Sequence, residues 1–554
     1  MANGTFAEML LDRAGDDHPG LLFEDASFTW AEVVLEARGR AGLLASFGPP
    51  PGAPDRPWHV GVLLENVPEY VFWIGGAALA GATVVGVNPT RRGDELAADI
   101  RHTDCDLIVT DAAHAALLDG LDTGVPDDRV LRVDSEAYAA RLPGEPAEPA
   151  RVAPGDRLLL LFTSGSTGAP KAVACGQGRL AAIARNAERM SITRDSVTYI
   201  AMPLFHGNAL MANLAMAVHA GATVAMRRKF SASGFLPDVR RYGVTYFNYV
   251  GRALAYILAT PERPDDADNP LCALFGTEAS AQDMARFSAR FGCRIIEGYG
   301  SSEGAISIQK TPDTPPDALG LPPQGMEVAV LDPATGRECP PARFGPDGGL
   351  LNPGEAIGEI VGLNVAAAFE GYYNDPEADA ERVRDGKYWS GDLGYRDADG
   401  FFYFAGRGND RLRVDSENFA AAPVERILSC WEPVVMCAVY PVPDPRTGDQ
   451  VMAALELGGP FDPDAFTAFL AGRRDLGTKW APRFVRIVES MPLTATGKVD
   501  KPPLRRARWD VSGDGAVWWR PGRGLAYEPL TAERAGAISA EFRANGRSHV
   551  LTAL

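Results

Sequence analysis

Short apolar runs alternate with amphipathic segments along most of this chain. Apolar runs typical of buried strands occur at residues 108–110, 158–162, 223–225 and 245–247. Apolar residues recur at helical spacing in residues 179–190 and 281–291, and Ser280 is placed to cap the second helix. Strand–helix alternation of this kind predicts a layered α/β fold with a largely parallel sheet.

The longest uncharged apolar run covers residues 71–87. It is too short and too rich in glycine and alanine for a membrane span, so we expect a buried helix, a break at Gly81 and then a buried strand. No basic segment precedes an apolar stretch at the N-terminus, where Asp12, Asp16 and Asp17 come early instead. We therefore expect a cytoplasmic protein without a transmembrane anchor, which touches membranes only peripherally.

Composition excludes several classes of protein. The 554 residues are 46% hydrophobic and 23% charged, which excludes wholesale disorder. The net charge of −18 repels phosphate backbones, so nucleic acid is not an expected partner. The seven cysteines are scattered without a C-x-x-C pair, which indicates reduced thiols rather than a disulfide framework or a zinc cluster.

The clearest chemical signal follows the apolar run at residues 158–162. It is a nine-residue segment, TSGSTGAPK, dense in hydroxyls and glycine and ending in a lysine. Glycine lets backbone N–H groups approach an anion, hydroxyls add donors, and a lysine supplies a point charge for phosphate. The spacing is not that of a P-loop. The expected phosphate-binding residues are Thr163, Ser164, Gly165, Ser166, Thr167, Gly168 and Lys171.

Five further motifs follow in a fixed order. They are residues 199–206 (YIAMPLFH), 299–304 (YGSSEG), 388–392 (YWSGD), 406–407 (GR) and 494–498 (TATGK). Together with the phosphate loop, this series resembles the adenylate-forming superfamily of acyl-CoA synthetases, adenylation domains and luciferases. Residues 242–252, 294–300, 416–419 and 527–531 are similar to its very-long-chain acyl-CoA synthetase and fatty-acid transport protein branch.

The resemblance implies a two-part architecture. Residues 1–408 would form a large N-terminal adenylation domain of layered α/β subdomains plus a small β-rich subdomain. Residues 409–554 would form a small mobile α+β domain that carries the catalytic lysine. The implied reaction is ATP-dependent activation of a fatty or other lipid-like carboxylic acid to its AMP ester, followed by thioester formation with coenzyme A.

The resemblance also implies roles for single residues. Glu303 would bind Mg²⁺, a cation that suits one carboxylate plus phosphate oxygens. Lys498 would act in adenylation, with Lys501 as the nearest competing lysine, and His206 would orient the acid. The remaining implied nucleotide-binding residues are Tyr299 against adenine, Gly300, Ser302, which replaces threonine, Asp392 at the ribose and Arg407.

Two departures from the family pattern bear on the thiol step. Asn409 stands at the hinge pivot, and Ser416 stands where a glycine would let the pantetheine arm pass, beside Glu417 on the expected coenzyme A path. Two alternatives therefore stay open. One is an acyl-AMP ligase that transfers the acyl group to a carrier-protein pantetheine, and the other is a non-catalytic acyl- or nucleotide-binding protein.

Overall fold

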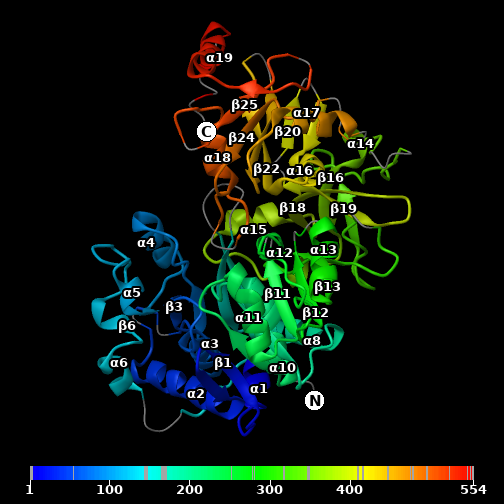
Figure 1. Ribbon diagram of the computed structural model, residues 1–554. Helices are drawn as coiled ribbons and strands as arrows, with labels where there is room; N and C mark the ends of the chain where they lie inside the picture. The colour runs from blue at the N-terminus through cyan, green and yellow to red at the C-terminus, as the bar shows by residue number, and fades with distance from the viewer. Residues whose placement is uncertain are drawn as a thin grey trace.

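The computed structural model describes most of the chain (Figure 1). The described residues are 4–50, 52–53, 55–142, 147–163, 171–250, 253–277, 279, 281–315, 318–345, 350–407, 411–414, 417–445, 448–473, 476, 479–494, 497–513, 515–522, 524–545, 547–548 and 551. Ser280, the expected helix cap, lies outside them.

A six-stranded sheet forms the first layer, with strand order β6-β5-β3-β4-β7-β8. Adjacent strands of this sheet pair in parallel, except β7 and β8, which are antiparallel. Every residue of β3, β4 and β5 is buried, as expected for apolar runs in a parallel sheet. The elements are α2 (Trp30–Ser46), β3 (His59–Leu63), α3 (Pro68–Ala80), β4 (Thr83–Gly86), α4 (Gly93–His102), β5 (Leu107–Thr110), α5 (Ala112–Ala115), β6 (Val130–Arg132), α6 (Glu136–Arg141), β7 (Arg157–Thr163) and β8 (Lys171–Gly176).

An eight-stranded sheet shares its core with the first, in the order β14-β13-β12-β11-β9-β10-β1-β2. Its inner neighbours are parallel, and β2 and β14 add antiparallel edges. The elements are α1 (Phe6–Leu11), β1 (Pro19–Phe23), β2 (Ala26–Thr29), α7 (Gln177–Ala184), α8 (Asn186–Arg189), β9 (Val197–Ile200), α9 (Gly207–Ala209), a π-helical turn (Leu210–Leu214), α10 (Ala215–Ala220), β10 (Thr223–Met226), α11 (Ala232–Tyr242), β11 (Tyr246–Val250), α12 (Ala253–Leu258), β12 (Ala273–Thr277), α13 (Ala281–Phe291), β13 (Arg294–Gly300) and β14 (Ser307–Gln309).

A third, antiparallel sheet follows, with strand order β15-β16-β18-β17 and β19 beside β18. This is the β-rich part that the sequence predicted before the hinge. Its elements are β15 (Val328–Leu331), α14 (Pro353–Ala356), β16 (Gly358–Gly362), α15 (Pro376–Arg382), β17 (Val383–Arg384), β18 (Lys387–Arg396) and β19 (Phe402–Arg407).

The last part of the chain builds a hairpin and a five-stranded mixed sheet, with core clusters of their own. Tyr256 of α12 packs against one of these clusters and donates a hydrogen bond to the sulfur of Met436 at 4.0 Å. The elements are β20 (Arg411–Val414), β21 (Glu417–Ala420), α16 (Ala421–Ser429), β22 (Val434–Pro443), β23 (Asp449–Leu457), α17 (Pro463–Gly472), β24 (Phe484–Val488), α18 (Lys501–Ala507), β25 (Val517–Trp519), β26 (Glu528–Pro529) and α19 (Ala532–Ala544).

The run at residues 71–87 folds as its composition predicts. Helix α3 ends at Ala80, Gly81 takes a left-handed conformation with φ +68°, and the buried strand β4 follows. Among the described residues no helix is both long and apolar enough to cross a membrane. Residues 179–190 are helical as predicted, except that the helix begins earlier, at Gln177, and is divided at Arg185 into α7 and α8.

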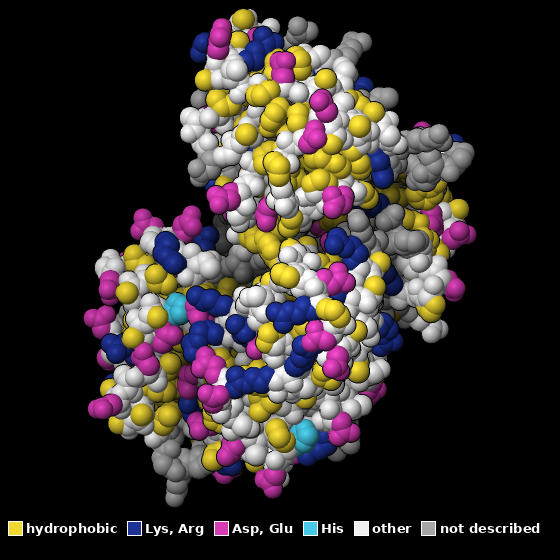
Figure 2. Space-filling view, in the orientation of Figure 1, with side chains coloured by type: hydrophobic (Ala, Val, Ile, Leu, Met, Phe, Trp, Pro, Cys, Tyr) yellow, Lys and Arg dark blue, Asp and Glu magenta, His cyan; other side chains and the backbone are white. Residues whose placement is uncertain are grey.

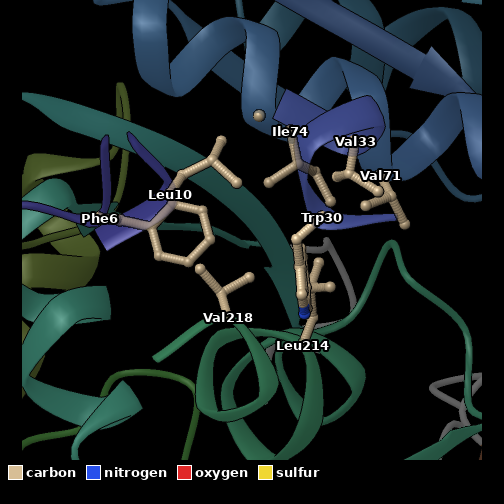
Figure 3. Close-up of a pocket in the computed structure, with 9 residues that line it drawn as sticks. Phe6, Leu10, Trp30, Val33, Val71, Ile74, Leu214 and Val218 are labelled. Atoms are coloured by element: carbon tan, nitrogen blue, oxygen red, sulfur yellow. The ribbon is translucent and has the colours of Figure 1, made fainter. Parts of the chain in front are cut away.

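A small void lies where α1, α2, α3 and α10 meet (Figure 3). Its volume is about 10 Å³, and its lining is almost wholly apolar. A space of this size holds about one water at most, so we regard it as a packing defect rather than a binding site. The lining residues are Phe6, Leu10, Trp30, Val33, Val71, Ile74, Gly75, Leu214 and Val218.

Candidate functional site

The predicted phosphate loop connects two antiparallel strands. Thr163 ends β7 and Lys171 begins β8, and the two residues are direct partners in the ladder. The Thr163 hydroxyl also donates to the Lys171 carbonyl at 3.5 Å. The hairpin is therefore closed at its base. The other predicted members, Ser164, Gly165, Ser166, Thr167 and Gly168, lie outside the described residues.

Lys171 points into the protein, and its side chain is only 7% exposed. Its ammonium lies 3.1 Å from Glu381 Oε2 and 5.3 Å from the ring centroid of Tyr372. The aromatic face and the paired carboxylate both attract the ammonium group and hold it in this position. It is thus placed to meet an incoming anion.

Glu303 is buried beside the same tyrosine. The phenol of Tyr372 donates to Glu303 Oε1 at 2.8 Å, and Arg382 Nε donates to the phenol oxygen at 3.1 Å. Burial and the nearby Glu303 carboxylate raise the pKa of Tyr372, so the phenol keeps its proton. Tyr372 therefore joins two residues that the sequence predicted for the phosphate end of the site, Lys171 and Glu303.

Arg179 of α7 holds the backbone of the segment that precedes Glu303. Its guanidinium donates to the carbonyls of Ser302 and, at 2.9 Å, of Ala174. Gly304 adopts φ +66°, and a Cβ there would collide with the same guanidinium. Gly300 ends β13 opposite Ser307 of β14. These contacts fix the turn that carries Glu303.

The predicted adenine and ribose residues contact each other. The Tyr299 phenol donates to Asp392 Oδ2 at 2.7 Å. Burial, followed by the Asp392 charge, raises the pKa of Tyr299, so it too stays protonated. Asp392 of β18 pairs with Arg407 of β19 in the antiparallel ladder. The backbone of Arg407, the third residue predicted for the nucleoside, therefore lies beside Asp392.

The segment around His206 lies between strand β4 and the turn that carries Ser302. A Cβ on Gly86, the last residue of β4, would lie 2.7 Å from the Phe205 carbonyl. On the other side, a Cβ on Gly207 would lie 3.4 Å from the Ser302 hydroxyl oxygen. The predicted acid-binding loop therefore lies directly beside the predicted nucleotide motif, and the close approach of Phe205 to β4 requires glycine at position 86.

His206 is neutral at physiological pH. Burial, reinforced by the charge of Lys498, lowers its pKa to about 3. Its Nε2 atom is buried with no hydrogen-bond partner in the described part of the chain. A neutral imidazole with a buried ring nitrogen can orient a polar ligand, but it is not protonated to act as an acid.

Lys498, from the C-terminal part of the chain, lies near enough to His206 for its charge to help lower the pKa of the imidazole. Its backbone closes a tight turn, in which Thr494 N donates to the Lys498 carbonyl at 2.7 Å and Gly497 takes φ +78°. The competing lysine is placed differently, because Lys501 forms an ion pair with Glu425 at 3.0 Å.

The expected thiol path is less fully described. Glu417 begins β21, where its backbone pairs with Val414. Asn409 and Ser416 lie outside the described residues.

Sequence reasoning missed three residues of this site: Tyr372, Glu381 and Arg382. Tyr372 stands in a Tyr–Tyr pair, and no local signal separates it from Tyr373. Glu381 and Arg382 resemble ordinary solvent-facing charges at the end of a short helix. Their contacts are made with residues far away in sequence, which only the fold reveals.

Comparisons with known proteins agree with this geometry. The family described as AMP-binding enzyme matches residues 11–373, and the AMP-binding enzyme C-terminal domain matches residues 423–498. The chain is 52% identical over 555 residues to a steroid-22-oyl-CoA synthetase of Rhodococcus jostii (strain RHA1), with 99% of each chain covered. It is 45% identical over 509 residues to the medium/long-chain-fatty-acid–CoA ligase FadD17 of Mycobacterium marinum (strain ATCC BAA-535 / M), covering 91% of this chain and 96% of that one.

Solved structures share the fold. ATP-bound MatB from Rhodopseudomonas palustris aligns with a TM-score of 0.78 at 23% identity, covering 92% of this chain and 100% of MatB. The anthranilate CoA ligase AuaEII aligns with the same TM-score at 21% identity, covering 92% of this chain and 98% of that one. The predicted α/β fold class is confirmed.

Proposed function

Because this chain belongs to the AMP-binding enzyme family, as its ordered motifs predicted, we propose that the residues around Tyr372 and His206 form its active site. The chain is an AMP-forming acid–thiol ligase, an acyl-CoA synthetase that acts through an acyl-AMP intermediate and uses ATP and coenzyme A. One observation carries the assignment of the site: Gly207, next to His206, lies against Ser302, next to Glu303. This contact supports an acid site that lies beside the phosphate site.

Within that site each charged group has a proposed task. The carboxylate of the acid attacks the α-phosphate of ATP, and catalysis consists mainly of positioning and charge neutralisation. Lys171 and Lys498 supply positive charge to the phosphates and to the reacting carboxylate. Neutral His206 orients the acid, and Asp392, with Tyr299 and Arg407, holds the nucleoside.

Mg²⁺ fits Glu303. A buried carboxylate oxygen is a ligand that this cation accepts, and Mg²⁺ in nucleotide sites needs only one or two carboxylates beside phosphate oxygens and water. When bound, Mg²⁺ would neutralise charge on the phosphates.

The proposed acid is lipid-like. Support comes from the two named relatives, which act on a steroid acid and on medium- or long-chain fatty acids. The steroid relative matches over 99% of both chains, so a steroid side-chain acid is our first candidate and a long-chain fatty acid the second. We also propose that the enzyme works in the cytoplasm and touches membranes only to collect substrate.

We place the proposed boundary between the N-terminal and C-terminal domains near residue 408. The core clusters formed after residue 411 contain none of the core residues that precede it, and Tyr256 is a point of contact between the two sides. A C-terminal domain with its own core can move as a unit. That motion would let Lys498 serve adenylation and then withdraw.

The function is tested with purified full-length enzyme and a panel of steroid side-chain acids and fatty acids. ATP–pyrophosphate exchange reports adenylation, and thioester formation with coenzyme A reports the second step. Exchange with a lipid-like acid followed by thioester is the expected result. Exchange without thioester would favour the carrier-protein acceptor, and no exchange with any acid would favour a binding protein.

A further inference from the structure

The strand-like segment at residues 371–373 sends two neighbouring tyrosines in opposite directions. Tyr372 forms a β-bridge with Val173 of β8, and Tyr373 N donates to the Ala172 carbonyl at 2.8 Å. Side chains alternate along such a segment. Tyr372 therefore reaches inward to Glu303, whereas Tyr373 reaches outward and donates to Asp104 Oδ2 at 2.7 Å.

Arg382, the last residue of α15, is wedged between two parts of the site. Its Nε donates to the Tyr372 phenol at 3.1 Å, and its Nη1 donates to the Trp389 carbonyl at 3.4 Å. Gly391 takes φ +76°, and a Cβ there would collide with the guanidinium. The absence of a side chain at Gly391 thus gives Arg382 its place next to the part of β18 that carries Asp392.

The hydrogen bonds that link Arg382, Tyr372 and Glu303 all donate in the direction of Glu303. An arginine can only donate, so the Tyr372 oxygen accepts from Arg382 and its proton goes to Glu303. The positive charge of Arg382 also acts on Glu303 through space. A carboxylate held by a charge-assisted donor chain has a fixed rotamer, which is what a carboxylate facing phosphates and a cation requires.

We propose that Tyr372 and Arg382 are positioning residues for Glu303: Arg382 orients the Tyr372 phenol, and the phenol holds the Glu303 carboxylate toward the metal-bound phosphates of ATP. The inference rests on the proposed function of this site. It adds two residues that do not belong to the motifs predicted from the sequence, and it assigns them an action through Glu303 rather than contact with substrate.

The test compares Tyr372→Phe with Tyr373→Phe in the full-length enzyme. Both changes remove one phenol oxygen that donates to a carboxylate, but only the first touches Glu303. A hydrogen bond to a charged group predicts that Tyr372→Phe slows ATP–pyrophosphate exchange about tenfold and raises the Mg²⁺ concentration for half-maximal ATP binding by a similar factor. Calorimetry measures that binding without turnover. Tyr373→Phe should change neither the exchange rate nor the Mg²⁺ concentration for half-maximal ATP binding. The KM for the acid should stay unchanged in both tyrosine variants.

A double-mutant cycle with Glu303→Gln separates positioning from general packing. If Tyr372 acts through Glu303, adding Tyr372→Phe to Glu303→Gln causes no further loss of Mg²⁺-dependent ATP binding. Arg382→Lys should retain more of that binding than Arg382→Gln, because it keeps the charge. Arg384→Gln is the control, since Arg384 stacks on the Trp389 ring 3.8 Å away.

Several results would overturn the proposal. These are equal behaviour of the two tyrosine variants, additive losses in the cycle, or a fall in melting temperature together with a changed KM for the acid in Tyr372→Phe. Failure of the proposed function looks different. In that case the unmutated enzyme itself gives no exchange with any acid.

Discussion

The phenol of Tyr299 donates a hydrogen bond to the carboxylate of Asp392 at 2.7 Å, across 93 positions of sequence. Tyr299 is the penultimate residue of β13 in the eight-stranded sheet, and Asp392 lies in β18 of the antiparallel sheet, so the bond joins two separate layers. The bond therefore holds the Asp392 carboxylate beside the Tyr299 ring, where the two layers meet.

Asp392→Asn is expected to raise the KM for ATP about tenfold or more, because it removes a charged acceptor from the nucleoside site. Tyr299→Phe keeps the ring and loses only the bond to Asp392, so its effect should be smaller. ATP–pyrophosphate exchange at varied ATP measures both. A larger loss in Tyr299→Phe would contradict the assignment of Asp392.

Lys498→Ala is expected to slow adenylation by about 10²–10³, the usual effect of removing one preorganised donor from a developing charge. Given preformed acyl adenylate and coenzyme A, the same variant should form thioester at the parent rate, because the second step does not use this lysine. Lys501→Ala is the control, since Lys501 is paired with Glu425. An equal loss of both half-reactions in Lys498→Ala would argue against the two-pose mechanism.

Glu381→Gln is expected to lower the KM for ATP, because Lys171 would no longer have to leave a carboxylate 3.1 Å away before meeting phosphate. Glu381 is 61% exposed, so the pair is weak and the change should be about two- to fivefold. Exchange kinetics at varied ATP measure it. A higher KM would mean that Glu381 holds Lys171 in its working position.

His59 is expected to make the fold sensitive to acid. Burial lowers its pKa to about 4, although its Nδ1 donates to the Thr103 carbonyl at 2.7 Å. The unfolded chain binds the proton more readily, so this stability is fully present above about pH 6.5 and is lost as the pH falls toward 4.

The variant His59→Asn keeps a donor for Thr103 and removes the titration. Its free energy of unfolding should therefore fall less steeply with acid, by up to about 1.4 kcal/mol per pH unit. Urea unfolding at several pH values measures the two slopes. Parallel slopes would show that other groups set the acid sensitivity.

Gly75→Ala and Gly76→Ala are each expected to destabilise the protein by about 1–3 kcal/mol through overpacking. A Cβ on Gly75 would lie 2.8 Å from the Ala37 Cβ, and one on Gly76 would lie 2.7 Å from the Arg40 Cβ, so α2 and α3 would be forced apart. The neighbouring void in Figure 3 is too small to relieve the clash.

The matched control is Gly39→Ala in α2, where a new Cβ meets nothing within 4 Å. Alanine is the better helix former there, so this change should stabilise by about 0.5–1 kcal/mol. Thermal unfolding compares the three variants. Stabilisation by Gly75→Ala would show that the two helices separate easily.

Local sequence determined much of the fold because the relevant interactions are local. The burial of β5 and β7 follows from the apolar side chains of these strands themselves. The break between α3 and β4 needs only the left-handed conformation of Gly81. The ordered motifs likewise determined the family. Surface charge gave less guidance, because acidic and basic side chains are interspersed on the face seen in Figure 2.

Only the tertiary structure distinguished residues whose sequence surroundings are alike. Tyr372 differs from Tyr373 because a β-bridge turns one side chain toward Glu303 and the other toward Asp104. Lys498 differs from Lys501 because one lies near His206 and the other pairs with Glu425. Such choices depend on elements far apart in the chain, and packing energies between those elements are not encoded in any single segment.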